Sequence, residues 1–405
     1  MKEERMLIVK KFGGTSVGDR DRIFNVANRC AEDYQKGNQV VVVLSAMGDT
    51  TDDLIDLAHS ISPNPPKREM DMLLSTGEQV SVALLAMAFA TMGIPAVSLN
   101  AWQVAMHTTS AYTNARFKRI DTERISNELD ANKIVIVTGF QGINKYDDIT
   151  TLGRGGSDTT AVALAATLHA DACEIYTDVD GVYTADPRKV KNAHKMKEVT
   201  YDEMLELATL GAQVLHNRSV EMAKKYNVQL VVRSSLTKAE GTVVKEVANV
   251  EKMLVSGVAA DKDAARIAII GVPNEPGVAF RIFSLLAKKK INVDMILQSV
   301  GRDNKKDISF TVSQDQANEA VEVLKEHQEE LHIEAFEEQL NVAKVSIVGA
   351  GMQTHSGVAA KMFEALYDAG VNIRMISTSE IRVTVLIDVE DVDRAVRAVH
   401  DKFFD

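Results

Sequence analysis

A glycine-rich segment at residues 151–158, within TTLGRGGSDTTA, carries side chains suited to binding an acid and a phosphate. Its three glycines allow close approach to a ligand and positive φ angles, and the apolar run that follows predicts a helix whose first N–H groups face the loop. Arg154 can pair with a carboxylate through two hydrogen bonds, Ser157 can donate one, and Asp158 can bind a cation or orient a lysine. The alternative is a glycine turn capped by Ser157 or Asp158.

A second glycine turn follows the apolar strand predicted at residues 6–12, MLIVKKF. Lys11 stands at the end of this strand beside Gly13 and Gly14, where an ammonium group and glycine N–H groups can meet phosphate oxygens. The segment contains neither the phosphate-loop motif GxxxxGK[ST] nor the dinucleotide motif GxGxxG. A solvated lysine is the alternative.

Hydroxyl and carboxyl groups follow the next predicted strand, residues 39–47. Ser45 and Thr51 fall at the carboxyl end of this strand, where ligands bind in open α/β sheets, although Thr51 could instead be a helix N-cap. Glu78 is an isolated acid within a long apolar helical tract. If Glu78 is buried it needs a partner, for which a substrate ammonium would serve; a helix-surface glutamate is the commoner case.

The segment CEIYTDVDGVYTADPRKV, residues 173–190, predicts a strand followed by a turn. Thr177 and Asp178 end the strand, Tyr183 offers a ring for stacking on a base, and Arg188 offers a charge for a polyphosphate. The segment is therefore a candidate nucleotide site, with an ordinary loop as the alternative.

Strands and helices alternate over the first 245 residues, which predicts an α/β domain with a mostly parallel sheet covered on both faces. From about residue 246 the pattern changes, and PGVAFRIFSLLAKKKINVDMILQS (276–299) recurs as SGVAAKMFEALYDAGVNIRMISTS (356–379). Each copy has the order βαββαβ of a ferredoxin-like domain. We therefore expect domains at 1–245, 246–335 and 336–405.

The overall composition excludes several classes of protein. A net charge of −11 argues against a nucleic-acid surface. The start of the chain lacks a signal peptide and no segment of about 20 apolar residues is apparent, so a cytoplasmic protein without membrane contact is expected. Cys30 and Cys173 lack metal-site spacing and are interpreted as buried thiols; no protein metal site is expected.

Six motifs in order along the chain resemble the aspartokinases of the amino acid kinase family. These are KFGGTS (11–16), SAMGDTTDDL (45–54), STGEQ (75–79), TTLGRGGSDTTA (150–161), TDVDGVYTADPR (177–188) and GAQVLHNRSVE (211–221). The resemblance implies an amino acid kinase-like three-layer sandwich. It also implies transfer of the γ-phosphoryl group of MgATP to the β-carboxylate of L-aspartate, the first step toward lysine, threonine and methionine.

The resemblance also implies roles for residues at the matching positions. Lys11 and Asp158 would be the catalytic pair, and the aspartate contacts would be Ser45, Thr51, Glu78, Arg154 and Ser157. The ATP contacts would include Lys11, Gly13, Gly14, Thr177, Asp178, Tyr183 and Arg188. Many relatives read GAKVLH where this chain has Gln213, which removes one positive charge from the expected nucleotide end.

The tandem repeat resembles ACT domains, which implies a feedback site for lysine, threonine or both. The regulatory candidates are Asn274, Gly277, Ala279, Asn292, Gln298, Ser356, Gly357, Asn372 and Thr378. Each could instead be only a turn former. Open strand edges predict a homo-oligomer, and an α₂β₂ assembly with a regulatory chain started at Met253 is a further hypothesis.

Three other readings compete with an aspartokinase. Kinases of the same fold for glutamate, acetylglutamate, carbamate or a nucleotide lack the tandem repeat. A silent amino-acid sensor would have lost Lys11, Arg154 or Asp158, and all three are present. From the length of the chain, no fusion to a homoserine dehydrogenase is expected.

Overall fold

The computed structural model describes residues 5–211, 214–247, 254–299, 304–353 and 355–404. Gln213 and Met253, for which the sequence suggested roles, lie outside these ranges. The chain divides into two compact units, which are described separately. Unit 1 comprises residues 1–182, 195–208 and 213–250, and unit 2 comprises residues 183–194, 209–212 and 251–405.

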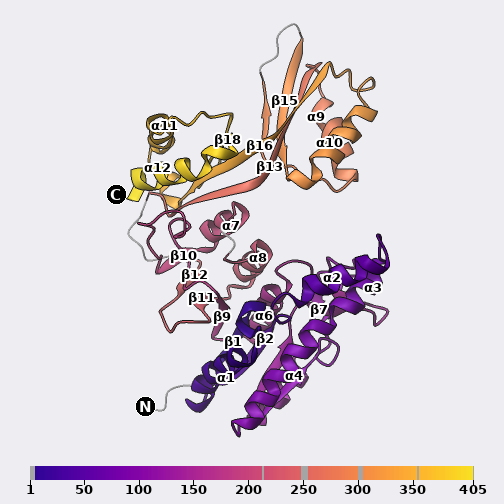
Figure 1. Ribbon diagram of the computed structural model, residues 1–405, viewed down its shortest axis with the longest axis vertical. Helices are drawn as coiled ribbons and strands as arrows, with labels where there is room; N and C mark the ends of the chain where they lie inside the picture. Colours follow the sequence, from indigo (N-terminus) through magenta and orange to yellow (C-terminus); the bar gives the residue numbers. More distant parts are fainter. Residues whose placement is uncertain (1–4, 212–213, 248–253, 300–303, 354, 405) are drawn as a thin grey trace. The chain divides into compact units, whose positions relative to one another are not determined.

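Unit 1 is built on an eight-stranded sheet in the order β10-β12-β11-β9-β1-β2-β6-β3. Figure 1 labels the strands from β10 to β2 of this order. Every neighbouring pair is parallel except β11 and β12, which confirms the mostly parallel sheet expected from the sequence. The strands are β1 (Leu7–Phe12), β2 (Gln39–Leu44), β3 (Ala96–Leu99), β6 (Ile134–Thr138), β9 (Ala172–Thr177), β10 (Glu198–Thr200), β11 (Leu230–Ser234) and β12 (Thr242–Lys245).

Helices cover this sheet on two faces. The helices of unit 1 are η1 (Gly14–Val17), α1 (Arg20–Gln35), α2 (Thr50–Ile61), α3 (Lys67–Leu74), α4 (Thr76–Thr91), α5 (Glu123–Asp130), α6 (Gly156–Leu168), α7 (Tyr201–Thr209) and α8 (Asn217–Tyr226). The apolar sides of α1 and α4 form one core with Phe12, Val42 and Ile136 of the sheet. Because side chains alternate along a strand, Lys11 faces away from that core, toward α6.

A small second sheet, which the sequence did not predict, lies in the same unit. Its order is β5-β4-β7-β8, from β4 (His107–Thr108), β5 (Phe117–Arg119), β7 (Gln141–Ile143) and β8 (Ile149–Thr151). These strands have two or three residues each, which is too short for an alternation of apolar and polar side chains to be recognised. The sheet matters because β8 leads directly into the glycine-rich segment.

One tract, Lys67–Thr91, is long and apolar enough to span a membrane by length and composition alone, contrary to the expectation from the sequence. It comprises α3 and α4, and half of its most apolar window is buried inside the protein. Val82, Leu85 and Phe89 of α4 are nearly or fully inaccessible to solvent and pack on the sheet. The core helix of an α/β domain can be equally long and apolar, so length and composition do not distinguish it from a membrane span.

Unit 2 contains a six-stranded antiparallel sheet in the order β14-β15-β13-β16-β18-β17. Its strands are β13 (Gly257–Pro273), β14 (Ile296–Gln298), β15 (Lys305–Val312), β16 (Ala335–Val348), β17 (Met375–Thr378) and β18 (Arg382–Asp388). Its helices are α9 (Val278–Lys288), α10 (Gln314–Glu326), η2 (Ala350–Gln353), α11 (Val358–Asp368), η3 (Val389–Asp391) and α12 (Val392–Phe404). The two copies of the repeat are joined through the long strands β13 and β16, which pair with each other.

The repeat predicted from the sequence is visible in matching helix starts. Gly277 and Gly357 are the N-caps of α9 and α11, with φ angles of 92° and 91°. A residue with a side chain is strained at such angles, so the same backbone requirement explains the glycine at both positions.

Candidate active site

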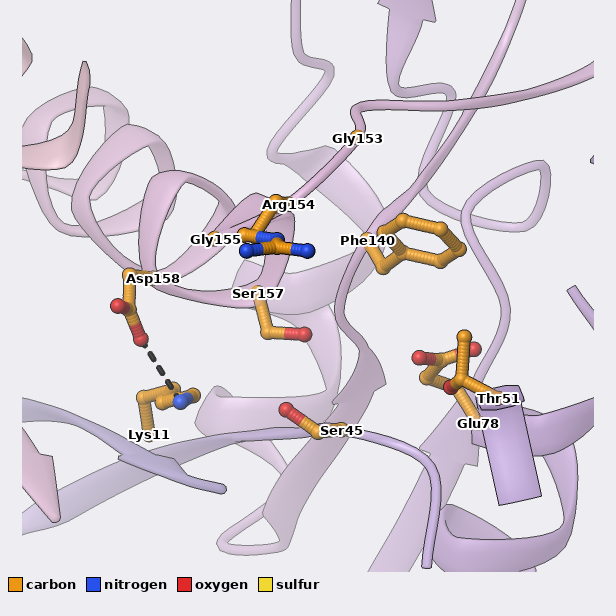
Figure 2. Close-up of a pocket in the computed structure, with 11 residues that line it drawn as sticks. Lys11, Ser45, Thr51, Glu78, Phe140, Gly153, Arg154, Gly155, Ser157 and Asp158 are labelled. Atoms are coloured by element: carbon orange, nitrogen blue, oxygen red, sulfur yellow. Dashed lines mark ion pairs between the residues drawn. The ribbon is translucent and has the colours of Figure 1, made fainter. Parts of the chain in front are cut away.

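A pocket of about 240 Å³ in unit 1 gathers the candidate catalytic and aspartate-binding residues (Figure 2). It is lined by Lys11, Ser45, Thr51, Glu78, Phe140, Gly153, Arg154, Gly155, Gly156, Ser157 and Asp158. Figure 2 shows Lys11 and Asp158 at one end and Glu78, Thr51 and Phe140 at the other, with Ser157 between them. Of these lining residues, sequence reasoning missed Phe140.

Lys11 and Asp158 form an ion pair at one end of the pocket. Lys11 Nζ lies 2.8 Å from Asp158 Oδ1, and the two side chains are 13% and 12% exposed. β1 supplies the lysine, and the first turn of α6 supplies the aspartate. The preceding residue, Lys10, faces the opposite side of the sheet, where it is buried against Asp33 and Glu174. Because side chains alternate along a strand, Lys11 faces the pocket and Lys10 does not.

The glycine-rich segment forms the wall from which Arg154 and Ser157 extend. Gly153 and Gly155 have φ angles of 78° and 69°, which favour glycine. A Cβ at Gly155 would also lie 2.2 Å from the ring of His216. α6 begins at Gly156, earlier than the sequence suggested, so Ser157 and Asp158 lie in its first turn and neither is the N-cap. The N-terminal end of α6 therefore faces the pocket, where it favours an anion.

Glu78 is buried at the other end of the pocket. It is 3% exposed, which rules out the helix-surface alternative. Its Oε1 accepts a hydrogen bond from Ala46 N at 3.2 Å, while Oε2 has no hydrogen-bond partner among the residues that the structure describes. Burial raises the pKa of Glu78 to about 8. An unsatisfied buried carboxyl oxygen of this kind has the chemistry to receive a cationic group.

The hydroxyl groups of Ser45 and Thr51 also line the pocket. Ser45 directly follows β2, and Thr51 lies in the first turn of α2. Asp49, not Thr51, is the N-cap of α2, which removes the alternative for Thr51. Both side chains are half-buried and contribute to the wall of the pocket.

Phe140 has a positive φ angle of 69° although it is not a glycine. Its N–H donates to Thr160 Oγ1 at 3.2 Å, and its carbonyl accepts from Leu152 N at 2.9 Å. Such conformations are costly and cluster at binding sites. The sequence offers no signal for it, because the conformation is imposed by contacts with residues distant along the chain.

Some of the nucleotide candidates lie beside Lys11 and others lie in the second unit. Thr177 is the last residue of β9, which pairs with β1, and Asp178 follows it. Thr177 Oγ1 donates to Asp178 Oδ1 at 2.8 Å. A Cβ at Gly13 would lie 3.5 Å from Lys11 Nζ, and one at Gly14 only 2.7 Å from Ala46 O, so Gly14 permits close packing of the two strand-end loops.

Tyr183 and Arg188 belong to unit 2 and are not among the residues that line the pocket. The Arg188 guanidinium donates to both carboxylate oxygens of Asp186 at 3.0 Å. The Arg188 side chain is 87% exposed.

Other sequence expectations concern metals and thiols. Among the described residues, no group of three or more His, Cys, Asp or Glu side chains could hold a metal ion. Cys30 and Cys173 are buried free thiols, as predicted.

Comparisons with known proteins identify the family. The model of the amino acid kinase family matches residues 6–234, and the ACT domain model matches 267–328 and 345–403. Aspartokinase 2 of Bacillus subtilis is 51% identical over 398 residues, which cover 98% of this chain and 97% of that protein. The aspartokinase of Bacillus sp. strain MGA3 is 52% identical over 398 residues, which again cover 98% of this chain and 97% of that protein. The chain belongs to the aspartokinase family. It has the aspartate kinase activity and the ACT regulatory domains that the resemblance predicted.

Solved aspartokinase structures agree with this assignment. Aspartokinase III of Escherichia coli in complex with aspartate and ADP has a TM-score of 0.84 at 26% identity, covering 98% of this chain and 100% of that one. A complex of the same enzyme with lysine and aspartate, described as the T-state, has a TM-score of 0.76. Aspartate kinase from Synechocystis is 48% identical, with a TM-score of 0.56, covering 98% of this chain and 69% of that one.

Proposed function

We propose that the pocket holds L-aspartate with its amino end at Glu78 and its β-carboxylate toward Lys11. The β-carboxylate oxygen attacks the γ-phosphorus of ATP, the bond to the bridging oxygen breaks, and 4-phospho-L-aspartate and ADP result. An ionised carboxylate is already a nucleophile, so no general base is needed and the task is alignment and charge neutralisation. The observation that carries the proposal is one pocket with a cation at one end and an unsatisfied buried acid at the other.

Lys11 neutralises charge on the transferred phosphoryl group in this proposal. Asp158 holds the Lys11 ammonium in place through the 2.8 Å ion pair. Ser45, Thr51 and Ser157 would donate hydrogen bonds to the substrate, and Arg154 would bind a substrate carboxylate through two parallel bonds. The amino group of aspartate would give Glu78 Oε2 the partner that it lacks in the described part of the chain.

ATP is proposed as the phosphoryl donor, in keeping with the ADP in the Escherichia coli relative. Gly13, Gly14, Thr177, Asp178, Tyr183 and Arg188 are its proposed contacts. Magnesium usually binds through one or two carboxylates together with substrate phosphates and water. The site fits an ion that arrives with the nucleotide, with Asp158 as the carboxylate near the phosphoryl group. The ion would offset negative charge on the phosphates.

A hydroxamate assay tests the reaction and its regulation together. Hydroxylamine traps an acyl phosphate, so incubation with ATP and aspartate should yield aspartyl hydroxamate, and glutamate in place of aspartate should yield little. The assay is repeated with lysine, with threonine and with both. We expect inhibition by lysine, stronger when threonine is present. Hydroxamate formation from glutamate at the same rate would contradict the proposal.

The regulatory proposal rests on the tandem domains of unit 2. We assign residues 1–245 to catalysis and 246–335 and 336–405 to two ACT-like domains that bind the effector. The proposed effector residues are Asn274, Gly277, Ala279, Asn292, Gln298, Ser356, Gly357, Asn372 and Thr378. The lysine complex of the Escherichia coli relative supports an amino acid as effector. A cytoplasmic homo-oligomer, or an α₂β₂ assembly with a shorter regulatory chain, completes the proposal.

Replacing Arg154 by lysine should raise the KM for aspartate by about tenfold, because an ammonium group cannot form two parallel bonds and one charged hydrogen bond is lost. The KM for ATP should stay within a factor of two. Steady-state kinetics with each substrate varied in turn gives both values. An unchanged KM for aspartate would remove Arg154 from substrate binding.

The affinity for aspartate should depend on pH through Glu78. Burial raises the pKa of Glu78 to about 8 in the free protein, so the free protein binds this proton at pH 7, whereas pairing with the substrate ammonium favours the ionised form. Binding therefore releases close to one proton, and the KM for aspartate should fall nearly tenfold per pH unit from pH 6 toward pH 8, then level off. Calorimetry in two buffers of different ionisation enthalpy measures the release. A KM independent of pH over this range would contradict the assignment.

A further inference from the structure

Two charged side chains outside the pocket, Asp71 and Arg218, form hydrogen bonds to the same two segments of the chain. The first segment is residues 113–115, and the second is residues 151–152, at the end of β8 and directly before Gly153. The two segments are hydrogen-bonded to each other, since Ala115 N donates to Thr151 O at 2.9 Å. A Cβ at Gly153 would lie 3.0 Å from Thr113 O, so the glycine-rich segment begins in close contact with residue 113.

Asp71 of α3 accepts hydrogen bonds from both segments. It is fully buried and accepts hydrogen bonds from Thr113 N at 3.1 and 3.0 Å. It also accepts from Thr151 N at 3.0 Å and from Thr151 Oγ1 at 2.7 Å. Both carboxylate oxygens are therefore used as acceptors, and no neutral side chain of the same shape can accept all of these bonds.

Arg218 of α8 joins the same segments with its guanidinium group. Nη1 donates to Leu152 O at 2.9 Å and Nη2 donates to Ala115 O at 2.7 Å. The two nitrogens of a planar guanidinium have a fixed separation, so the group sets the spacing of the two carbonyls. Arg218 lies within the GAQVLHNRSVE motif, to which the catalytic proposal assigns no described side chain.

The residues held in this way are followed at once by the groups that contact the substrate. Arg154 and Ser157 lie within five residues of Leu152 along the chain. Displacement of a substrate-positioning group by about 1 Å can cost on the order of a hundredfold in rate. The segment that carries Arg154 therefore needs an anchor at its start, and Asp71 and Arg218 provide it.

We propose that Asp71 and Arg218 are positioning residues for aspartate: they fix the start of the glycine-rich segment and thereby the place of Arg154 in the pocket. The inference rests on the proposed role of Arg154. Neither side chain lines the pocket, so each acts through the segment that it holds. Both are expected to affect aspartate more than ATP.

The test measures the KM for aspartate, the KM for ATP and kcat for Arg218→Gln and Asp71→Asn. We expect the KM for aspartate to rise about 10- to 100-fold, with the KM for ATP within a factor of two. Arg218→Lys keeps the charge but can bond well to one carbonyl at a time, so it should give an intermediate KM. Lys224→Gln on α8 and Glu69→Gln on α3 are matched controls, since both side chains form ion pairs at the surface, and both should leave the kinetics unchanged.

The double variant Arg154→Lys with Arg218→Gln separates positioning from a general loss of stability. If Arg218 acts through Arg154, the two effects on the KM for aspartate are less than multiplicative. Multiplicative effects, or equal increases in both KM values that follow a lowered Tm, would overturn the inference. If Arg218→Gln does not fold, Arg218→Lys supplies the same comparison. An unchanged KM in Arg154→Lys alone would instead refute the proposed role of Arg154.

Discussion

Replacing Lys11 by alanine is expected to lower kcat by about 10³- to 10⁵-fold, the range for cationic groups that stabilise phosphoryl transfer. The Lys11 ammonium lies at the pocket end occupied by Asp158, 2.8 Å from its carboxylate. Removing it leaves the developing charge without its neutralising partner and leaves Asp158 as an unpaired acid near the phosphates. The KM for aspartate should change much less, because Glu78 and Arg154 are intact. Steady-state kinetics of purified Lys11→Ala measures both.

Two controls define the interpretation of Lys11→Ala. Lys238→Ala removes an exposed lysine that pairs with Glu32 at the surface, and it should retain full activity. Asp158→Asn keeps the volume of the carboxylate but weakens the hold on the Lys11 ammonium, so it should lower kcat in the same direction. If Lys11→Ala kept more than a tenth of the wild-type kcat, Lys11 could not have the proposed role.

Glu78→Gln should raise the KM for aspartate by at least about 30-fold. The loss of one partner of a buried charge pair costs about 2 kcal/mol or more, and each 1.4 kcal/mol is a factor of ten in affinity. The glutamine keeps the size of the side chain and can still accept from Ala46 N, as Glu78 does at 3.2 Å. It cannot supply the negative charge that the substrate ammonium needs. Substrate kinetics and calorimetry on the variant provide the measurement.

The pH dependence distinguishes this role of Glu78 from a packing role. Glu78→Gln should abolish both the fall of KM between pH 6 and pH 8 and the proton release on binding. The stability of the wild-type protein should also change with pH. The folded protein binds the Glu78 proton more tightly than the unfolded chain, so that contribution to stability is lost as pH rises toward about 8, and the glutamine variant should lack this loss. A variant with an unchanged KM and the wild-type pH profile would exclude Glu78 from ammonium binding.

Local chemistry along the chain was sufficient to predict most of the side chains that line the pocket. Lys11 at the end of a strand and the glycine-rich segment around Arg154 could be recognised because each motif is continuous in sequence, and the ends of parallel strands meet at one sheet edge. The order of strands and helices predicted the mostly parallel sheet, and the recurrence of 24 residues predicted the tandem repeat of the second unit. The family resemblance then supplied the substrate, which spacing alone did not.

Other features could not be predicted because they depend on contacts between distant residues. Asp71 and Thr151 are 80 residues apart, and Arg218 and Ala115 are 103 apart. Nothing in the sequence near Asp71 distinguishes it from a surface acid. The sequence likewise allowed Glu78 to be a buried acid or a helix-surface acid, and its burial in the structure decided between them. The conformation of Phe140 likewise follows from Thr160 and Leu152.

The sequence by itself determined the chemical groups, their strand and helix setting, and the family. Only the tertiary structure decided which groups share the pocket and which residues hold them there. The physical reason is that hydrogen bonds and burial act over a few ångströms in space, whatever the separation along the chain. A motif reports the groups within one loop, whereas the raised pKa of Glu78 and the anchoring by Asp71 and Arg218 arise only when separate loops are packed together.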